Sequence, residues 1–333
     1  MKWKKLGLAL VQMFLGAGLV LILALSVTVL GKDSTNKTFP GWTTLSPPEN
    51  ITSLAIDGST LWIGSKEGIF KVDLESNNIS PVEVTGVSSG FVKDLLCDAG
   101  NIWVLYEYDL VRISKEDGEV SFWEIEKILP GEPKTLALDG NKKLWIGSEK
   151  GLIVFDGKTF EPISIPEKFK FRSVDVLFAD SKNRIWVGSS DPMNQYLLRY
   201  EQSSWHSYSV SDGILHGSIN DIIEDSDGNV IVAVGYGSVG GVVCFKDNKW
   251  ESVLPDSVEI KGKVRSVFKD KEGRLLLGSE YDGLGVFSKG ILQYYTVKEG
   301  LAGNEVRKIL QDFSGAYWVA TNQGLTRVES GKI

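Results

Sequence analysis

The chain has 333 residues, 42% of them hydrophobic, and contains 36 glycines and 10 tryptophans. Many glycines with regularly placed aromatic residues favour short strands joined by tight turns over a helical fold. The net charge of −7, with no stripe of Lys and Arg interleaved with aromatics, argues against a nucleic acid partner.

The first five residues are basic, and residues 6–30 that follow are uncharged and mostly apolar. As a helix this run would be roughly 37 Å long, enough to cross a hydrocarbon core of ~30 Å. It is also longer than the apolar region of a cleaved signal peptide, which has about 7–15 residues. We therefore expect residues 6–30 to form a transmembrane signal-anchor helix. Cleavage between residues 26 and 31 is the alternative.

The basic flank, residues 1–5, is expected to stay in the cytoplasm, which places the rest of the chain outside the cell. Residues 31–40 are polar and end in a proline, so they are expected to be a linker. The sequence thus predicts a single-pass protein of the cell membrane with an extracytoplasmic domain over residues 41–333.

An aspartate recurs in this domain at intervals of 41, 41, 41, 45, 45 and 42 residues. Each copy follows a short apolar strand and precedes a turn, after which come a second strand such as LWIGS, a third, and a fourth with an aromatic near its start. Four antiparallel strands repeated seven times predict an all-β fold, a seven-bladed β-propeller. The seven aspartates are Asp57, Asp98, Asp139, Asp180, Asp225, Asp270 and Asp312.

These aspartates are expected to be structural, because a carboxylate at a strand-to-turn junction accepts hydrogen bonds from turn N–H groups. A ring of cation-binding carboxylates is the alternative. Only six fourth strands follow in order, so the seventh is expected from residues 41–46, pairing with the last blade and closing the ring. The linker would then enter on the face of the first-to-second turns, and the opposite face would point away from the membrane.

The repeated pattern, an apolar strand followed by D-x-x-G, LWIGS or a variant, and a G-L pair, resembles the two-component regulator propeller repeat. That repeat occurs in extracytoplasmic sensor regions of bacterial hybrid histidine kinases. The best matching copies are residues 57–69, 139–152 and 312–325, and the resemblance extends over residues 41–333. It implies ligand detection, including of carbohydrates, and signalling through a membrane helix. Since the sequence carries no kinase or regulator segment, a separate signalling partner is expected.

Blades four and five each carry four extra residues between their second and third strands, in SSDPMNQYL and VGYGSVGGV, and blade six carries SEYDGLG. Their amide, carboxylate and tyrosine groups suit a polar ligand such as a saccharide, a small metabolite or a peptide. The alternative is that these are ordinary variable loops. The candidate ligand-binding residues are Asp191, Asn194, Gln195, Tyr196, Tyr236, Tyr281 and Asp282.

The residue just before each first strand is expected at the mouth of the central channel. The mixed character of these seven residues does not suggest a uniform metal-binding ring, and no metal or cofactor is expected. They are Asn50, Phe91, Glu132, Ser173, Ser218, Lys263 and Glu305.

His206 and His216 are the only histidines, and His216 is the better candidate for a general base. Streptogramin lyases and sugar lactonases are propeller enzymes that use channel-facing His and carboxylates with a divalent metal. No such cluster recurs at a common depth here, so no catalytic residue is expected. A metal held by His216 with Glu132 or Glu305 would instead support a lyase-like or lactonase-like enzyme.

The sequence therefore favours a ligand-binding, sensor-type module without enzymatic activity. A scaffold for protein–protein interaction, with a broad exposed patch around Tyr196, Tyr236 and Tyr281, is the first alternative. Cys97 and Cys244 lie in distant repeats and are expected to be free thiols.

Overall fold

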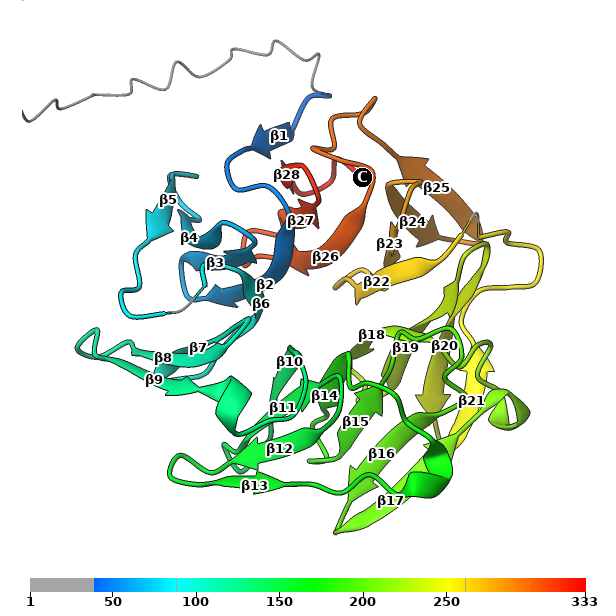
Figure 1. Ribbon diagram of the computed structural model, residues 1–333. Coiled ribbons are helices and arrows are strands. Elements are labelled where there is room, and N and C mark those ends of the chain that lie inside the picture. Colours follow the sequence, from blue (N-terminus) through cyan, green and yellow to red (C-terminus); the bar gives the residue numbers. More distant parts are fainter. Residues whose placement is uncertain (1–38, 88, 261) are drawn as a thin grey trace, which may run out of the picture. The chain divides into compact units, whose positions relative to one another are not determined.

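The computed structural model describes residues 39–87, 89–260 and 262–333. These residues form seven four-stranded antiparallel sheets around a common centre (Figure 1). The predicted seven-bladed propeller with four antiparallel strands per blade is thus confirmed. The predicted membrane helix over residues 6–30 lies outside the described residues. Within those residues, no helix has the length and apolarity needed to cross a membrane.

In each blade the first strand is innermost and the fourth outermost. Blade one has β2 (Ile51–Asp57), β3 (Thr60–Ser65), β4 (Gly68–Asp73) and β5 (Ile79–Val82). Blade two has β6 (Val92–Cys97), β7 (Asn101–Tyr106), β8 (Asp109–Ser114) and β9 (Val120–Glu124). Blade three has β10 (Pro133–Leu138), β11 (Leu144–Ser148), β12 (Leu152–Phe155) and β13 (Phe160–Pro162). Blade four has β14 (Val176–Ala179), β15 (Ile185–Gly188), β16 (Leu197–Glu201) and β17 (Ser204–Tyr208).

Blade five has β18 (Ile219–Glu224), β19 (Val230–Tyr236), β20 (Val239–Lys246) and β21 (Lys249–Ser252). Blade six has β22 (Val264–Lys269), β23 (Leu275–Ser279), β24 (Leu284–Ser288) and β25 (Ile291–Tyr295). Blade seven has β26 (Val306–Gln311), β27 (Tyr317–Thr321), β28 (Gly324–Val328) and β1 (Trp42–Leu45). Short 3-10 helices η1 (Ile125–Lys127), η2 (Glu167–Phe169) and η3 (Val210–Asp212) lie in the connections between blades.

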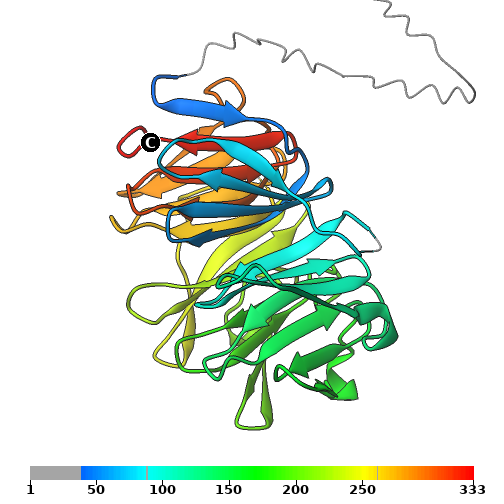
Figure 2. The same ribbon diagram turned by 90° about the vertical axis from the view of Figure 1, so that its left-hand side faces the viewer.

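The ring of blades closes through the two ends of the described chain. Each inner strand contacts the inner strand of the next blade, and β26 contacts β2. Figure 2 shows the blue first strand beside the red strands of the last blade. β1 completes blade seven by pairing antiparallel with β28, with Trp42 opposite Val328 and Leu45 opposite Leu325. This pairing gives the third strand of blade seven a partner on its outer side, so the blade does not end on an exposed edge at that strand.

The glycine of the LWIGS pattern makes room for the neighbouring blade. A Cβ atom added at Gly188 would lie 2.6 Å from Cγ2 of Ile219, the first residue of the next inner strand. A Cβ at Gly147 would lie 2.4 Å from Cγ1 of Val174, and a Cβ at Gly64 would lie 2.6 Å from Cγ1 of Val92. Glycine is therefore required at this position of the pattern, because a neighbouring blade leaves no room for a Cβ atom.

The recurring aspartates organise the turns, as expected of structural residues. The Asp312 carboxylate accepts hydrogen bonds from the Ala316 N–H at 3.1 Å and from the indole of Trp318 at 2.8 Å. The same Asp–Trp bond occurs in blades two, three and four. In blade one, Asp57 instead pairs with Lys115 at 2.7 Å, and the Trp62 indole N–H is buried without a partner.

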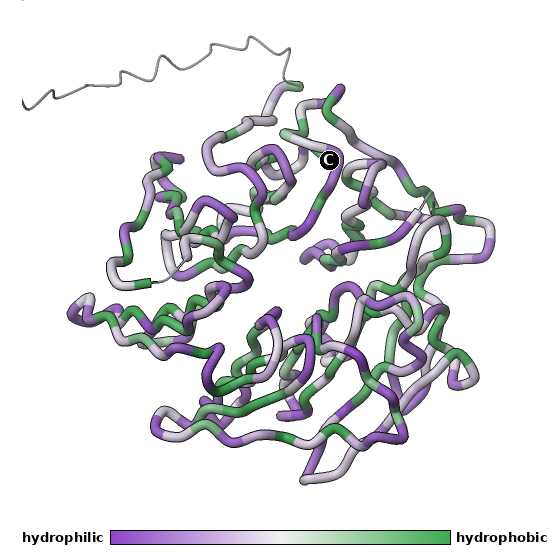
Figure 3. The backbone as a smooth tube through the Cα atoms, viewed as in Figure 1, coloured by the Kyte–Doolittle hydropathy of each residue, from purple (hydrophilic) through white to green (hydrophobic). Residues whose placement is uncertain are grey.

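The apolar core is divided among the seven interfaces between blades. One cluster joins Trp186 of blade four to Ile219 and Phe245 of blade five, and equivalent clusters occur at the other interfaces. Figure 3 shows hydrophobic stretches along β11 and β12 and hydrophilic stretches on the inner strands β22 and β26. The blades are therefore held together by apolar faces, while polar side chains remain for the centre of the ring.

Candidate functional site

A β-bulge near the start of the inner strands turns one side chain of each into the central channel. The register shifts by one residue at this point in six blades, and in blade four Asp175 stands just ahead of β14 at the same position. A bulge leaves its extra residue unpaired and redirects its side chain. The seven residues are Thr52, Lys93, Lys134, Asp175, Asn220, Arg265 and Arg307, and all of them line a cavity of about 650 Å³.

Most of these side chains bond to the next blade. The Thr52 hydroxyl donates to the Val92 carbonyl at 2.8 Å, and the Asn220 amide donates to the Val264 carbonyl at 3.0 Å. A guanidinium N–H of Arg307 donates to the Ile51 carbonyl at 3.3 Å. The channel mouth is therefore a chain of polar contacts from blade to blade.

Carboxylates form ion pairs with the cationic side chains of this ring of polar contacts. Glu132 pairs with Lys93 of blade two and with Lys134 at 2.5 Å, and Glu305 pairs with Arg265 of blade six and with Arg307 at 3.0 Å. Two lysines bonded to Glu132 hold the pKa of its carboxyl below the usual value, against a smaller opposing effect of burial. The four cations of the ring are thus ion-paired within the protein, namely Lys93, Lys134, Arg265 and Arg307.

Asp175 differs from the other charged residues of the ring, because its side chain makes no ion pair within 4.0 Å with any described residue. One of its carboxylate oxygens accepts hydrogen bonds from the Ser173 hydroxyl at 2.7 Å, from the Ser190 N–H at 2.8 Å, and from the Ser189 and Ser190 hydroxyls at 3.1 Å. No Lys, Arg or His of the described residues lies within 4.0 Å of that carboxylate. The half-buried ammonium group of Lys263 interacts with Asp175 only from beyond 4.0 Å. A fixed carboxylate that makes no direct ion pair is suited to bind hydroxyl or ammonium groups of a ligand.

Deeper in the channel, Asp94 joins three blades. Its carboxylate accepts hydrogen bonds from the Ser53 hydroxyl at 2.7 Å and from the Leu136 N–H at 2.9 Å. Burial raises the pKa of the Asp94 carboxyl, outweighing these hydrogen bonds and the positive charge of Lys308. Asp94 is therefore a structural link between blades one, two and three.

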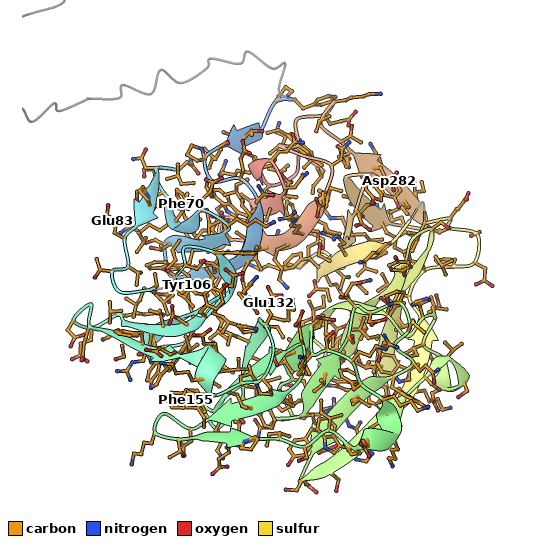
Figure 4. The ribbon with its side chains drawn as sticks, viewed as in Figure 1. Phe70, Glu83, Tyr106, Glu132, Phe155 and Asp282 are labelled. Atoms are coloured by element: carbon orange, nitrogen blue, oxygen red, sulfur yellow. The ribbon has the colours of Figure 1, made fainter. Side chains whose placement is uncertain are left out.

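The residues that the sequence predicted at the mouth lie next to the bulged ones. Glu132 and Glu305 hold cations, and Glu132 lies near the centre of the ring in Figure 4. Phe91 lies beneath the Lys93 ammonium, 3.7 Å from its ring centroid, and Ser173 bonds Asp175. The other three are Asn50, with a positive φ of 48°, Ser218, whose hydroxyl donates to the Ser190 carbonyl, and half-buried Lys263.

The predicted loop residues of blade four are largely bound within the protein. The Asn194 amide is buried and donates to the carbonyls of Tyr196 at 2.8 Å and Gly217 at 2.7 Å. Tyr196 packs edge-on against Phe169, and Asp191 accepts a hydrogen bond from the Met193 N–H at 2.7 Å. Gln195 is exposed and lines a hollow of about 360 Å³ that also contains Asn194 and His216.

In blade five the expected loop is a β-hairpin. β19 and β20 continue their pairing to Tyr236 opposite Val239, so only two residues remain in the turn. Gly235 and Gly237 have φ values of 130° and 60°, which glycine adopts without strain at such a turn. Tyr236 is 53% exposed beside this turn and Tyr281 of blade six is 75% exposed.

Asp282 belongs with the hairpin of blade five rather than with blade four. A Cβ at Gly262 would lie 3.5 Å from a carboxylate oxygen of Asp282 and 3.6 Å from the Gly237 carbonyl. Asp282 also accepts a hydrogen bond from Ser279, and Figure 4 places it on a different side of the ring from Glu132. The seven candidate residues thus fall into two groups, one on blade four and one on blades five and six.

His216 accepts a hydrogen bond from the Ser218 N–H through Nδ1 and lies beside Gln195. No group of three or more His, Cys, Asp or Glu side chains with the spacing of a metal site occurs in the described part of the chain. Cys97 and Cys244 are both free thiols here.

No protein-family model matches this chain, and neither does any curated protein. Its fold is nevertheless similar to many solved structures. One is the extracellular domain of the hybrid two-component system BT3049 from B. thetaiotaomicron, with 22% identity and a TM-score of 0.70. The alignment covers 88% of this chain and 41% of that one, so this chain spans less than half of that relative's length.

Virginiamycin B lyase from Staphylococcus aureus is similar too, with 14% identity and a TM-score of 0.68, over 86% of this chain and 98% of the lyase. YCF48 bound to a D1 peptide has 15% identity and a TM-score of 0.66, over 88% of this chain and 98% of its own. One fold thus occurs in the extracellular domain of a two-component system, in a lyase and in a protein bound to a peptide. Similarity at this level of identity shows the propeller fold, and the function has to be argued from the site.

Proposed function

We propose that this protein is an extracytoplasmic, sensor-type binding module that takes a small polar ligand at the mouth of its propeller channel. The proposal rests on the carboxylate of Asp175, which lines the channel cavity and makes no direct ion pair with the described residues. Among the seven residues that take this position in the described ring, Asp175 is the only anionic one, and no cation lies within 4.0 Å of it. A ligand with hydroxyl or ammonium groups would complete its hydrogen bonds.

The cavity behind Asp175 agrees with a ligand of this kind. Its volume of about 650 Å³ falls within the range of roughly 300–1,000 Å³ that is usual for small-molecule sites. Its wall includes the carboxylate of Asp175 and the side chain of Asn220. Saccharides, amino-group metabolites and short peptides all present donors to such groups.

Side chains around the channel mouth and the N-terminal segment would support this function. The exposed side chains of Gln195, Tyr236 and Tyr281 would contact the outer part of a larger ligand. A membrane helix over residues 6–30 would hold the propeller at the cell surface, and a separate partner would carry the signal onward.

The test is a thermal-shift screen of the purified full-length protein against oligosaccharides, amino acids and short peptides. A ligand that binds only the folded state raises the melting temperature, by about 2.7 kcal/mol of stability at 100 times its Kd. We expect a hit whose shift is lost in Asp175→Asn. The matched control is Asp227→Asn, an exposed turn residue at the first-to-second turn of blade five, which should keep the shift. A panel without any shift would count against the proposal.

A protein-interaction scaffold is the second candidate, favoured by exposed Met193, Tyr236 and Tyr281 on blades four to six. Aromatic and Met side chains are enriched at the centres of interfaces. Under this candidate Tyr281→Ser would weaken capture of a partner while Asp175→Asn would not. A lyase-like activity remains a third candidate, which rests on similarity of fold alone.

A further inference from the structure

A second hollow lies between blades three and four, and it shares no lining residue with the channel. It has a volume of about 390 Å³. Its walls are the turn between β11 and β12, the end of β13, and the irregular segment 163–174 that connects the two blades and contains η2. It is a separate site, and its argument does not depend on the proposed function of the channel.

The floor of this hollow is apolar. Leu152 and Val174 are 2% and 1% exposed, and half-buried Ile163, Ile165 and Phe171 cover its sides. An apolar surface of this kind favours a ligand with a hydrocarbon body, because binding removes that body from water. Hydroxyl-rich ligands gain little from such a floor.

Two of the three cations at the rim lack an ion-pair partner among the described residues, in contrast to the cations that pair with Glu132 and Glu305 at the channel mouth. Lys150 and Lys170 have no carboxylate within 4.0 Å among the described residues, and the nearest one to Arg172 is that of Asp191 at 3.8 Å. Of the two acidic residues at the rim, Glu149 is engaged by Lys134 at 3.5 Å, which leaves Glu167. The unpaired charge at the rim is therefore positive.

The connecting segment also contains backbone donors that are not used within the protein. The N–H groups of Phe171, Arg172 and Ser173 make no hydrogen bond within the described residues, and regular bonding resumes only where the Val174 N–H donates to Ser148. Backbone N–H groups without an internal partner, near cationic side chains, can donate to a carboxylate.

We infer that this hollow binds a small organic acid in which a carboxylate is attached to a branched aliphatic or aromatic body. The hydrocarbon body would lie on Leu152, Ile163 and Val174. The carboxylate would face Lys170 and Arg172 at the rim. Tight binding would need both the hydrocarbon body and the negative charge. An apolar amide lacks the charge and acetate lacks the hydrocarbon body, so both should bind weakly.

The experiment is a calorimetric titration of the full-length protein with 3-phenylpropanoate and 4-methylpentanoate, with 3-phenylpropanamide and acetate as matched ligands. We expect both apolar acids to bind at least tenfold more tightly than the amide and acetate. Lys170→Gln with Arg172→Gln should weaken the acids at least tenfold. Lys158→Gln, an exposed lysine on the third-to-fourth strand turn of blade three, should leave them unchanged.

The two sites share no lining residue and are titrated with different ligands, so failure of the channel proposal and failure of this one are separate results. Equal binding of acid and amide, or undiminished binding to the Lys170/Arg172 double variant at an unchanged melting temperature, would overturn the inference. Absence of binding by both acids at millimolar concentration would overturn it as well.

Discussion

Lys308 of blade seven reaches past blade six to blade five, where its Nζ lies 3.0 Å from the Asp221 carboxylate. Asp221 is buried and also accepts a hydrogen bond from the Val267 N–H of blade six at 3.1 Å. Burial alone would lower the pKa of Lys308, but the charges of Asp221 and Asp94 and the hydrogen bond to Asp221 raise it overall. One cation thus compensates two carboxylates in the channel.

Replacing this cation should destabilise the propeller. We expect Lys308→Met to lower the free energy of unfolding by about 2 kcal/mol, the usual contribution of a hydrogen bond to a charged group. In a double-mutant cycle with Asp221→Asn, the second change should cost less after the first than alone, by about 0.5–3 kcal/mol. Urea unfolding at pH 7 measures both values. Strictly additive effects would show that the two side chains do not interact.

The stability contribution of Asp94 should change with pH. Because its pKa is higher in the folded chain than its ordinary value of 3.8, folding takes up protons between those two pKa values. The contribution is therefore most favourable at pH below 3.8 and declines as the pH rises through the folded pKa. The stability of the wild type relative to Asp94→Asn should thus fall from pH 4 to pH 7 in urea titrations. A difference that grows with pH would contradict this assignment.

A side chain at Gly188 should force blades four and five apart. Its Cβ would lie 2.6 Å from Ile219, so Gly188→Ala should cost about 1–3 kcal/mol, the usual cost of overpacking. Gly90→Ala is the matched control, because nothing lies within 4 Å of its Cβ position. Thermal unfolding of both variants tests the comparison, and an equal effect at the two positions would argue against close packing at the interface.

The repeated aspartates should differ in importance according to their partners. Asp312→Ala removes the acceptor for the Trp318 indole and for the Ala316 N–H, and we expect a loss of roughly 3 kcal/mol. Asp57→Ala removes a partly exposed ion pair with Lys115 and should cost less than about 1 kcal/mol. Chemical unfolding separates these values, and a larger loss for Asp57→Ala would reverse the interpretation.

The blades could be predicted from the sequence because the repeat supplies seven independent copies of one pattern. A single apolar strand is ambiguous, but Asp139 followed by Trp145 and Gly147 at the same spacing as Asp180, Trp186 and Gly188 is not. The indole bond to each aspartate and the contact of each glycine with the next blade explain why those residue types recur.

The channel residues were harder to predict, because a bulge is a local change of register rather than a pattern of residue types. The residues expected at the mouth lie beside Lys93, Arg265 and the other bulged residues, which line the cavity. A polar residue directly after a buried first residue, as in Val92–Lys93 and Val264–Arg265, is a signal that would have located them. The sequence predicts a loop where blade five has a hairpin, because glycines are typical of turns, although Gly235, Gly240 and Gly241 remain paired in β19 and β20.

The most direct test of ligand binding at the channel mouth is the affinity of the best screened ligand for three variants, measured by titration calorimetry. Loss of a charged hydrogen bond costs about 1.5–3 kcal/mol, so Asp175→Asn should weaken binding by roughly 10-fold to 150-fold. Gln195→Ala and Tyr236→Ala, on the outer loops, should each change the affinity by less than about threefold. An Asp175→Asn variant that binds as tightly as the wild type, at an unchanged melting temperature, would contradict the assignment of the site.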